Sequence, residues 1–262
     1  MNQVITIDYK QLEMLRQSAI AKQRRTLNKD MILPAENEIE RDIAGEHTSE
    51  PIKDINDINR ISAYLIGKER YRDNMLFIVG INFGLRVSDL LKLRFCDLIN
   101  NDLTFKETFA ILEQKTSTTR NTKRNRHITI NDAVIESVKL YLSHNKCKLD
   151  DYMFRSQSNR GSNTNTPMTR KSVDRIMKEI GESLELKNKM ATHTLRKTFA
   201  YHQMLMSKND PRKLLLLQKI FGHSSPTMTL DYIGITNEEI NKAYKDLNLG
   251  SNNHYPVDSE IE

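Results

Sequence analysis

The sequence predicts a mainly α-helical protein with one small antiparallel β-sheet, an α+β fold class. Apolar residues recur at helical spacing over most of the chain from Ile52 onward. Two short runs of strand character interrupt this pattern, and a polar, basic segment lies between them. The chain has 262 residues, 38% of them hydrophobic, so it can bury the core of one large domain, with or without an appendage.

The first 48 residues differ in composition from the rest, and we expect them to form a helical arm and a linker. Residues 8–27 have apolar side chains at helical spacing. The polar stretch after them contains the helix breakers Pro34, Gly45 and Pro51. A frayed extension of the main domain would explain the same pattern equally well.

Three amphipathic helices are expected next, over residues 52–68, 72–86 and 86–98. The apolar segment 75–85 is typical of a buried core helix. No apolar run approaches the roughly 20 residues that a membrane-spanning helix needs. The first ten residues also lack the basic and apolar regions of a signal peptide. We therefore expect no membrane partner and a cytoplasmic location.

Two strand-like runs, Thr108–Gln114 and His127–Asn131, favour a β-hairpin. Residues 115–126, "KTSTTRNTKRNR", join them and include no apolar residue. We therefore expect a long, charged tip, which by default would be a solvated loop.

Helices are expected over most of the remaining chain. They cover residues 132–145, 169–184, 192–206, 210–222 and 236–249, with a short helix around Tyr232. Asn131 or Asp132 would cap the first of these helices. Thr236 and Glu239 have the spacing of a capping box at the start of the last.

The charge and the cysteine content narrow the possible functions only moderately. The net charge is +6, from 40 basic and 34 acidic residues, which permits a nucleic-acid partner without demanding one. Cys96 and Cys147 are far apart and form no metal-binding spacing, so neither a zinc site nor a disulfide framework is indicated.

Several polar residues stand at the edges of apolar segments and could form one anion-binding pocket. Arg86 and Asp89 are three residues apart, as are His193 and Arg196, so each pair would share a helix face. Arginine offers a planar fork for phosphate oxygens, and histidine can donate a hydrogen bond or move a proton. Taken alone, however, Arg86 and Asp89 are more simply read as a structural ion pair.

The segment "KIFGHSSPTMTLDYIG" adds a second histidine and a candidate nucleophile. His223 follows a glycine at the end of a leucine-rich helix, and Tyr232 comes nine residues later. A tyrosine hydroxyl has a reference pKa near 10, so positive neighbours are needed to make its phenolate accessible. The alternative is a core tyrosine with its hydroxyl at the surface.

Four segments in this order resemble the signature boxes of the tyrosine recombinases, the phage integrase family. They are "GLRVSDLLKL", "HTLRKTFA", "IFGHSS" and "TLDYIGI". The resemblance covers residues 52–250 and implies the catalytic-domain fold of that family. It implies a catalytic domain at 49–250, a flexible tail at 251–262, and no full core-binding domain before residue 49. Phe221 stands where the family usually has leucine, an apolar replacement.

The resemblance also assigns roles. Tyr232 would be the nucleophile and Asp89 a supporting acidic residue. The other catalytic residues implied are Arg86, Lys115, His193, Arg196 and His223. Lys123 competes with Lys115 for the lysine's role, but Lys115 directly follows the strand. The hairpin residues Arg120, Lys123, Arg124 and Arg126 would then contact the DNA backbone.

The family chemistry implies a covalent 3′-phosphotyrosyl intermediate, which needs neither a metal ion nor another cofactor. It implies double-stranded DNA at a specific site as partner, and a homo-tetramer on that DNA, with or without accessory DNA-bending proteins. A bacterial cytoplasmic protein, associated with the nucleoid when bound to DNA, is expected. The short N-terminal segment would supply fewer phosphate contacts than a complete clamp.

Three functions remain open from the sequence. The leading one is a site-specific recombinase or integrase of a phage, plasmid or transposon. A type IB topoisomerase-like enzyme would use the same chemistry without strand exchange. A catalytically silent or accessory DNA-binding protein could keep the fold, although all seven expected positions hold chemically competent residues.

Overall fold

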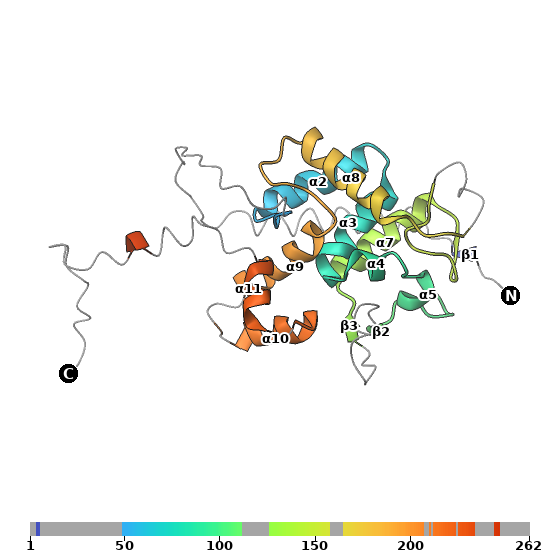
Figure 1. Ribbon diagram of the computed structural model, residues 1–262. Helices are drawn as coiled ribbons and strands as arrows, with labels where there is room; N and C mark the ends of the chain where they lie inside the picture. The colour runs from blue at the N-terminus through green and yellow to red at the C-terminus, as the bar shows by residue number, and fades with distance from the viewer. Residues whose placement is uncertain are drawn as a thin grey trace, which may run out of the picture.

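Two groups of helices that meet at α9 make up most of the structure (Figure 1). The structure is a computed structural model. It describes residues 4–5, 49–111, 126–157, 165–206, 210, 212–223, 225–233 and 244–246. The predicted mainly helical class with a small antiparallel sheet is confirmed.

The larger group surrounds α3, which is buried on nearly all sides. Its long helices are α2 (Ile55–Gly67), α3 (Tyr71–Phe83), α7 (Asp132–His144) and α8 (Arg170–Ser183). Met75, Phe77 and Val79 of α3 are among the most buried side chains, and the helix packs against α2, α7 and α9. A helix that is apolar all round is buried in this way. The long apolar run at residues 75–85 is therefore a core helix, as expected.

Side-chain caps define the starts of these helices. Asp54 accepts a hydrogen bond from the Asn56 amide at the start of α2, and Thr169 accepts one from Ser172 at the start of α8. The N-cap of α7 is Asn131, whose side chain accepts a hydrogen bond from the backbone amide of Val134. The choice between Asn131 and Asp132 is thus settled.

The predicted continuous helix over 86–98 is wrong. The chain forms two short helices instead, α4 (Val87–Leu90) and α5 (Phe95–Leu98). Between them Arg94 is extended, with φ −111° and ψ 160°. Here Leu93 O accepts from the amide of Met153, and the amide of Phe95 donates to Asp151 O. These hydrogen bonds to residues 151–153 replace the backbone hydrogen bonds of a continuous helix. The extended backbone at Arg94 allows the apolar residues on both sides of it to enter the core.

The predicted β-hairpin is present at its base. Strand β2 (Thr108–Ile111) pairs antiparallel with β3 (Arg126–Thr129), and Phe109 lies opposite Ile128 with both side chains buried. The tip of the hairpin lies outside the described residues. A second antiparallel pairing was not predicted: β1 (Val4–Ile5) joins β4 (Cys147–Lys148). The helix expected over residues 8–27 is also outside the described part.

The smaller group contains α9 (Thr194–Leu205), α10 (Arg212–Phe221) and α11 (Pro226–Ile233). A separate apolar cluster that includes Ala200, Leu217 and Phe221 holds the three helices together. Gly222 ends α10 with φ 66°, a left-handed conformation that glycine adopts without strain. Of the helix expected over 236–249, the structure describes residues 244–246, which are helical. No helix among the described residues has the length and apolar character to cross a membrane.

Candidate active site

The predicted nucleophile and one predicted histidine are in direct contact. Tyr232 lies near the end of α11, and its hydroxyl is 2.6 Å from His193 Nδ1. His193 occupies the N-cap position of α9, so its ring projects from the start of that helix. An unprotonated Nδ1 would accept a hydrogen bond from the phenol in this geometry.

Arg196 is fixed beside this pair by two backbone carbonyls. Its side chain is buried, with 2% relative exposure. Nη1 donates to Gly84 O at 2.8 Å, and Nη2 donates to Phe221 O at 3.2 Å. Both acceptors lie at helix C-termini, where carbonyls lack helical partners and favour a cation. The guanidinium carbon also lies 4.2 Å from the centroid of the Phe221 ring.

Arg86 reaches the same place from another element. It is the extended N-cap residue of α4, with φ −65° and ψ 144°, and its Nη2 donates to Phe221 O at 3.2 Å. Two guanidinium groups therefore converge on one carbonyl oxygen next to the tyrosine. Asp89, on α4, is buried with 1% exposure, and its amide donates to Arg86 O. Because Arg86 precedes α4, the two residues do not share a helix face as the spacing suggested.

The sharp turn at Arg86 depends on a glycine. Gly84 has φ 56°, and a Cβ at this position would lie 2.5 Å from the ring of Phe199 in α9. A side chain at this position would push α9 away from the end of α3. Gly84 thus allows the carbonyl that Arg196 binds to approach α9 closely.

His223 joins the site from the C-terminal end of α10. Its ring centroid is 5.3 Å from that of Tyr232. Its Nδ1 lies 3.0 Å from the hydroxyl of Thr229, a fully buried residue of α11. The hydrogen bond to Thr229 fixes the orientation of the imidazole, so the short helix positions both the histidine and the tyrosine.

The surrounding charges act on both members of the His193–Tyr232 pair. Burial raises the pKa of Tyr232, whereas Arg196, Arg86 and Arg170 act to lower it. Desolvation lowers the pKa of His193, and the same arginines together with Lys197 lower it further. His193 is therefore suited to accept a proton at neutral pH, and Tyr232 keeps its proton until a base removes it.

Two of these cations were missed in the sequence. Lys197 follows Arg196 and lies four residues after His193, so helical spacing could have placed it on the face of that histidine. Arg170, the first residue of α8, stands 23 residues before His193, and no local pattern connects the two.

Most of the predicted hairpin residues lie outside the described part of the chain: Lys115, Arg120, Lys123 and Arg124. Arg126 is the described one. Its Nη2 donates to Phe83 O at 2.6 Å, next to the carbonyl that Arg196 binds. The base of the hairpin is thereby attached to the end of α3, at the edge of the site.

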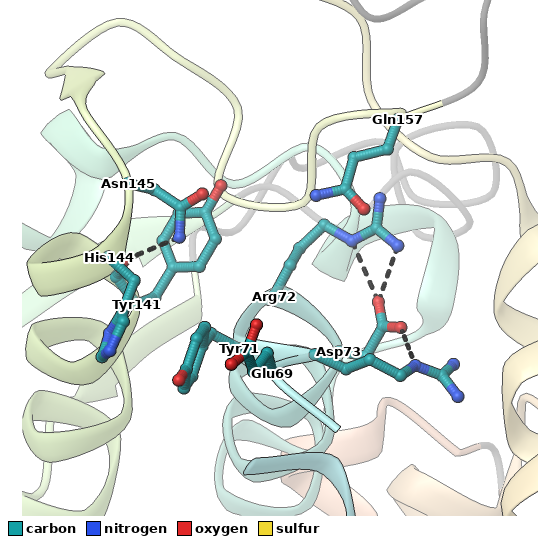
Figure 2. Close-up of a pocket in the computed structure, with 9 residues that line it drawn as sticks. Glu69, Tyr71, Arg72, Asp73, Tyr141, His144, Asn145 and Gln157 are labelled. Carbon is teal, nitrogen blue, oxygen red and sulfur yellow. Dashed lines mark hydrogen bonds and ion pairs between the residues drawn. The ribbon is translucent and has the colours of Figure 1, made fainter. Parts of the chain in front are cut away.

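A separate cavity of about 340 Å³ lies at the opposite end of α3 (Figure 2). Three of its charged groups are engaged with one another, because Asp73 receives hydrogen bonds from both Arg70 and Arg72. His144 stacks on Tyr71, with 3.8 Å between the ring centroids. Among the described residues, no three His, Cys, Asp or Glu side chains form a group that could hold a metal ion.

Comparison with known proteins identifies the family. The sequence model of the phage integrase family matches residues 51–239. The chain belongs to the phage integrase family. The integrase domain is 34% identical over 199 residues to "Probable integrase/recombinase YoeC" of Bacillus subtilis (strain 168), covering 76% of this chain and 97% of that protein. It is 30% identical over 192 residues to "Tyrosine recombinase XerA" of Pyrococcus furiosus, and this match covers 72% of this chain and 59% of that protein.

Solved structures agree with the integrase fold. The crystal structure of XerA recombinase aligns with a TM-score of 0.54 at 18% identity, covering 76% of this chain and 66% of that one. A Tn1549 transposon integrase in complex with transposon right end DNA also aligns with a TM-score of 0.54 at 18% identity. That alignment covers 92% of this chain and 79% of the transposon integrase. The resemblance of the sequence to a tyrosine recombinase catalytic domain is thus confirmed. The chain spans nearly all of the Bacillus relative but 59% of XerA from Pyrococcus.

Proposed function

We propose that this integrase-family protein is a site-specific recombinase of a mobile element that cuts and rejoins DNA through a 3′-phosphotyrosyl intermediate. The observation that carries the proposal is the 2.6 Å contact between His193 Nδ1 and the hydroxyl of Tyr232, beside two converging arginines. The match to the phage integrase family supports it. A phage, plasmid or transposon would each be a suitable source of such an enzyme.

The first step would be attack by Tyr232 on a DNA phosphate. The phenol proton passes to His193 Nδ1 while the oxygen forms a bond to phosphorus. The bond from phosphorus to the 5′-oxygen of the next nucleotide then breaks. His193 is suited to this role because its pKa is lowered, so the imidazole is neutral before attack.

Arg86 and Arg196 would bind the non-bridging oxygens of the phosphorane transition state. Their guanidinium groups are brought together by the Phe221 carbonyl before any substrate arrives, and such preorganised charge is often the largest catalytic contribution. His223, oriented by Thr229, would donate a further hydrogen bond. Asp89 would support the start of α4 from the core.

The leaving 5′-oxygen needs a proton, and we assign its delivery to Lys115 on the hairpin. The attachment of Arg126 to the end of α3 supports this assignment, because it brings the base of the hairpin to the site. Arg120, Lys123, Arg124 and Arg126 would contact the DNA backbone. In the reverse reaction the 5′-hydroxyl attacks the phosphotyrosine, and the bond energy stored there makes ATP unnecessary.

The partner would be double-stranded DNA carrying a specific site. A homo-tetramer on that DNA, with or without accessory DNA-bending proteins, would be needed to exchange four strands. We assign residues 49–250 to the catalytic domain, residues 1–48 to an arm and linker, and 251–262 to a tail. The protein would act in the bacterial cytoplasm, at the nucleoid when bound to DNA.

The test is trapping of a covalent adduct on suicide DNA. A pool of nicked duplexes with a randomised central region is incubated with the protein, because the short 5′-hydroxyl fragment diffuses away after cleavage. Adducts that survive detergent are recovered and sequenced. Wild type is expected to give adducts enriched in one sequence, and Tyr232→Phe is expected to give none. Equal adduct formation by the two proteins would contradict the proposal.

The same experiment separates the other functions. Strand joining between two copies of the enriched duplex would indicate a recombinase. Relaxation of supercoiled plasmids that lack this sequence would instead indicate a topoisomerase-like enzyme. Sequence-specific binding with no adduct would indicate a catalytically silent DNA-binding protein.

A further inference from the structure

Lys197, the residue after Arg196, directs a second cation toward the tyrosine. Its Nζ is 5.9 Å from the centroid of the Tyr232 ring, within the range at which a cation is attracted to an aromatic ring. The guanidinium carbon of Arg196 lies at the same distance from that centroid. Two consecutive residues of α9 therefore both place positive charge near one phenol.

The surroundings of Lys197 do not explain it as a structural residue. Its side chain is partly buried, and desolvation lowers the pKa of its ammonium group, an effect that Glu50 opposes. In the part of the chain that the structure describes, this ammonium takes part in no hydrogen bond or ion pair. Removing a cation from water without a hydrogen-bonded or ion-paired partner costs folding free energy, which the attraction to Glu50 offsets only in part. A site where charge is needed is a common reason for such an arrangement.

Lys197 also differs from the other charged groups around the phenol. The groups that face Tyr232 come from α4, α8, α9 and the end of α10: Arg86, Arg170, His193, Arg196, Lys197 and His223. Lys197 itself is faced by Tyr232 and by Glu50 from the segment before α2. Arg86 and Arg196 are both bound to the Phe221 carbonyl, which directs them to the shared pocket. Lys197 is not bound to that carbonyl.

We propose that Lys197 is a positioning residue for the nucleophile, whose ammonium group stabilises the negative charge that develops on Tyr232 as its proton moves to His193. This inference rests on the proposed function. Lys197 transfers no proton in this role, so it differs from the general acid assigned to Lys115. It acts through Tyr232 and not through the DNA backbone, so its loss should leave DNA affinity unchanged.

The experiment measures single-turnover adduct formation on the nicked duplex that wild type selects, as a function of pH. Lys197→Gln should slow adduct formation about tenfold at neutral pH. Lys197 lowers the pKa of His193, so without this cation that pKa should rise, and the rate profile should move to higher pH. Lys197→Arg restores the charge and should remain within about threefold of wild type. The control is Lys146→Gln, which removes an exposed lysine near the opposite end of α3.

Each alternative role for Lys197 predicts a different result. A 5′-bridging phosphorothiolate that rescues Lys197→Gln would make Lys197 a general acid and overturn the proposal. Weaker binding with a smaller salt dependence and an unshifted pH profile would make it a phosphate contact, which would also overturn it. The proposal would also be overturned if Lys197→Gln formed adducts as fast as the control Lys146→Gln. It would equally be overturned if Lys197→Gln and Lys197→Arg lost the same activity at every pH. If Lys197→Gln fails to fold, Lys197→Met replaces it.

The experiment also separates this inference from the proposed function. Adducts that form with wild type but not with Tyr232→Phe establish the nucleophile, whatever Lys197 does. If wild type forms no adduct, the proposed function fails first.

Discussion

His193 and Tyr232, 39 residues apart in the sequence, share a hydrogen bond of 2.6 Å between Nδ1 and the phenol oxygen. His193 begins α9, and Tyr232 lies one residue before the end of α11. The apolar cluster around Phe221 packs α9, α10 and α11 together and so brings this base and this nucleophile into contact.

Tyr232→Phe should abolish covalent attachment to DNA and leave folding and non-covalent binding nearly intact. Only the hydroxyl is removed, while the ring keeps its contacts with Phe221 and His223. Adducts are counted on denaturing gels, and binding is measured by mobility shift. A detergent-resistant adduct formed by Tyr232→Phe would show that another residue is the nucleophile.

Adduct formation should persist to a pH below the ordinary titration range of histidine. The active form of His193 is neutral, and desolvation with nearby cations lowers its pKa, so activity is lost only as pH falls through that lowered value. The measurement is the adduct rate from about pH 5 to pH 8. His193→Gln should remove this acidic limb together with most of the rate. A limb at or above the ordinary pKa of histidine would contradict the role of His193 as base.

Arg86→Ala and Arg196→Ala should each lower the cleavage rate by at least about two orders of magnitude, the loss found on removing one oxyanion donor. Lysine should restore little activity at either position, because an ammonium cannot reproduce the bidentate fork. The buried Arg196 also links α3 to α10, so thermal unfolding must be measured for its variants. Rates within threefold of wild type for folded alanine variants would rule out the proposed pocket.

Thr229→Val should lower the adduct rate about tenfold, less than the loss of a whole general acid or base. Valine has nearly the shape of threonine, but it cannot hold Nδ1 of His223 at 3.0 Å. Thr229→Ser is the matched control, because it keeps the hydroxyl and should retain most of the activity. If Thr229→Val and Thr229→Ser form adducts at the same rate, the hydrogen bond does not orient His223.

Lys115→Ala should be rescued by a 5′-bridging phosphorothiolate, which leaves without a proton, whereas Lys123→Ala should not. Loss of Lys123 should instead weaken DNA binding. It should also reduce the slope of the logarithm of the binding constant against the logarithm of the salt concentration by about one unit, as expected for one lost phosphate contact. Cleavage rates and binding at several salt concentrations give both quantities. Rescue of Lys123→Ala alone would exchange the two roles.

Local patterns in the sequence predicted most of the helices, the base of the hairpin and the candidate residues that the fold brings together. The apolar run of α3 predicts a buried helix, and the polar pair Asn131 and Asp132 predicts the start of α7, which Asn131 caps. The boxes around Arg86, His193, His223 and Tyr232 identified the family, because their residue types and order are specific. Each of these signals lies within one short segment of the chain.

Contacts between distant segments decided the rest. The helix expected over 86–98 is broken because hydrogen bonds to residues 151–153 satisfy its backbone while apolar side chains enter the core. The pairing of β1 with β4 joins segments more than 140 residues apart. Arg170 joins the site only because the tertiary fold brings the start of α8 near Tyr232, whereas the four-residue spacing of Lys197 from His193 already favours its place there. Charge acts through space, so its effect on Tyr232 follows from tertiary distances that no local spacing in the sequence records.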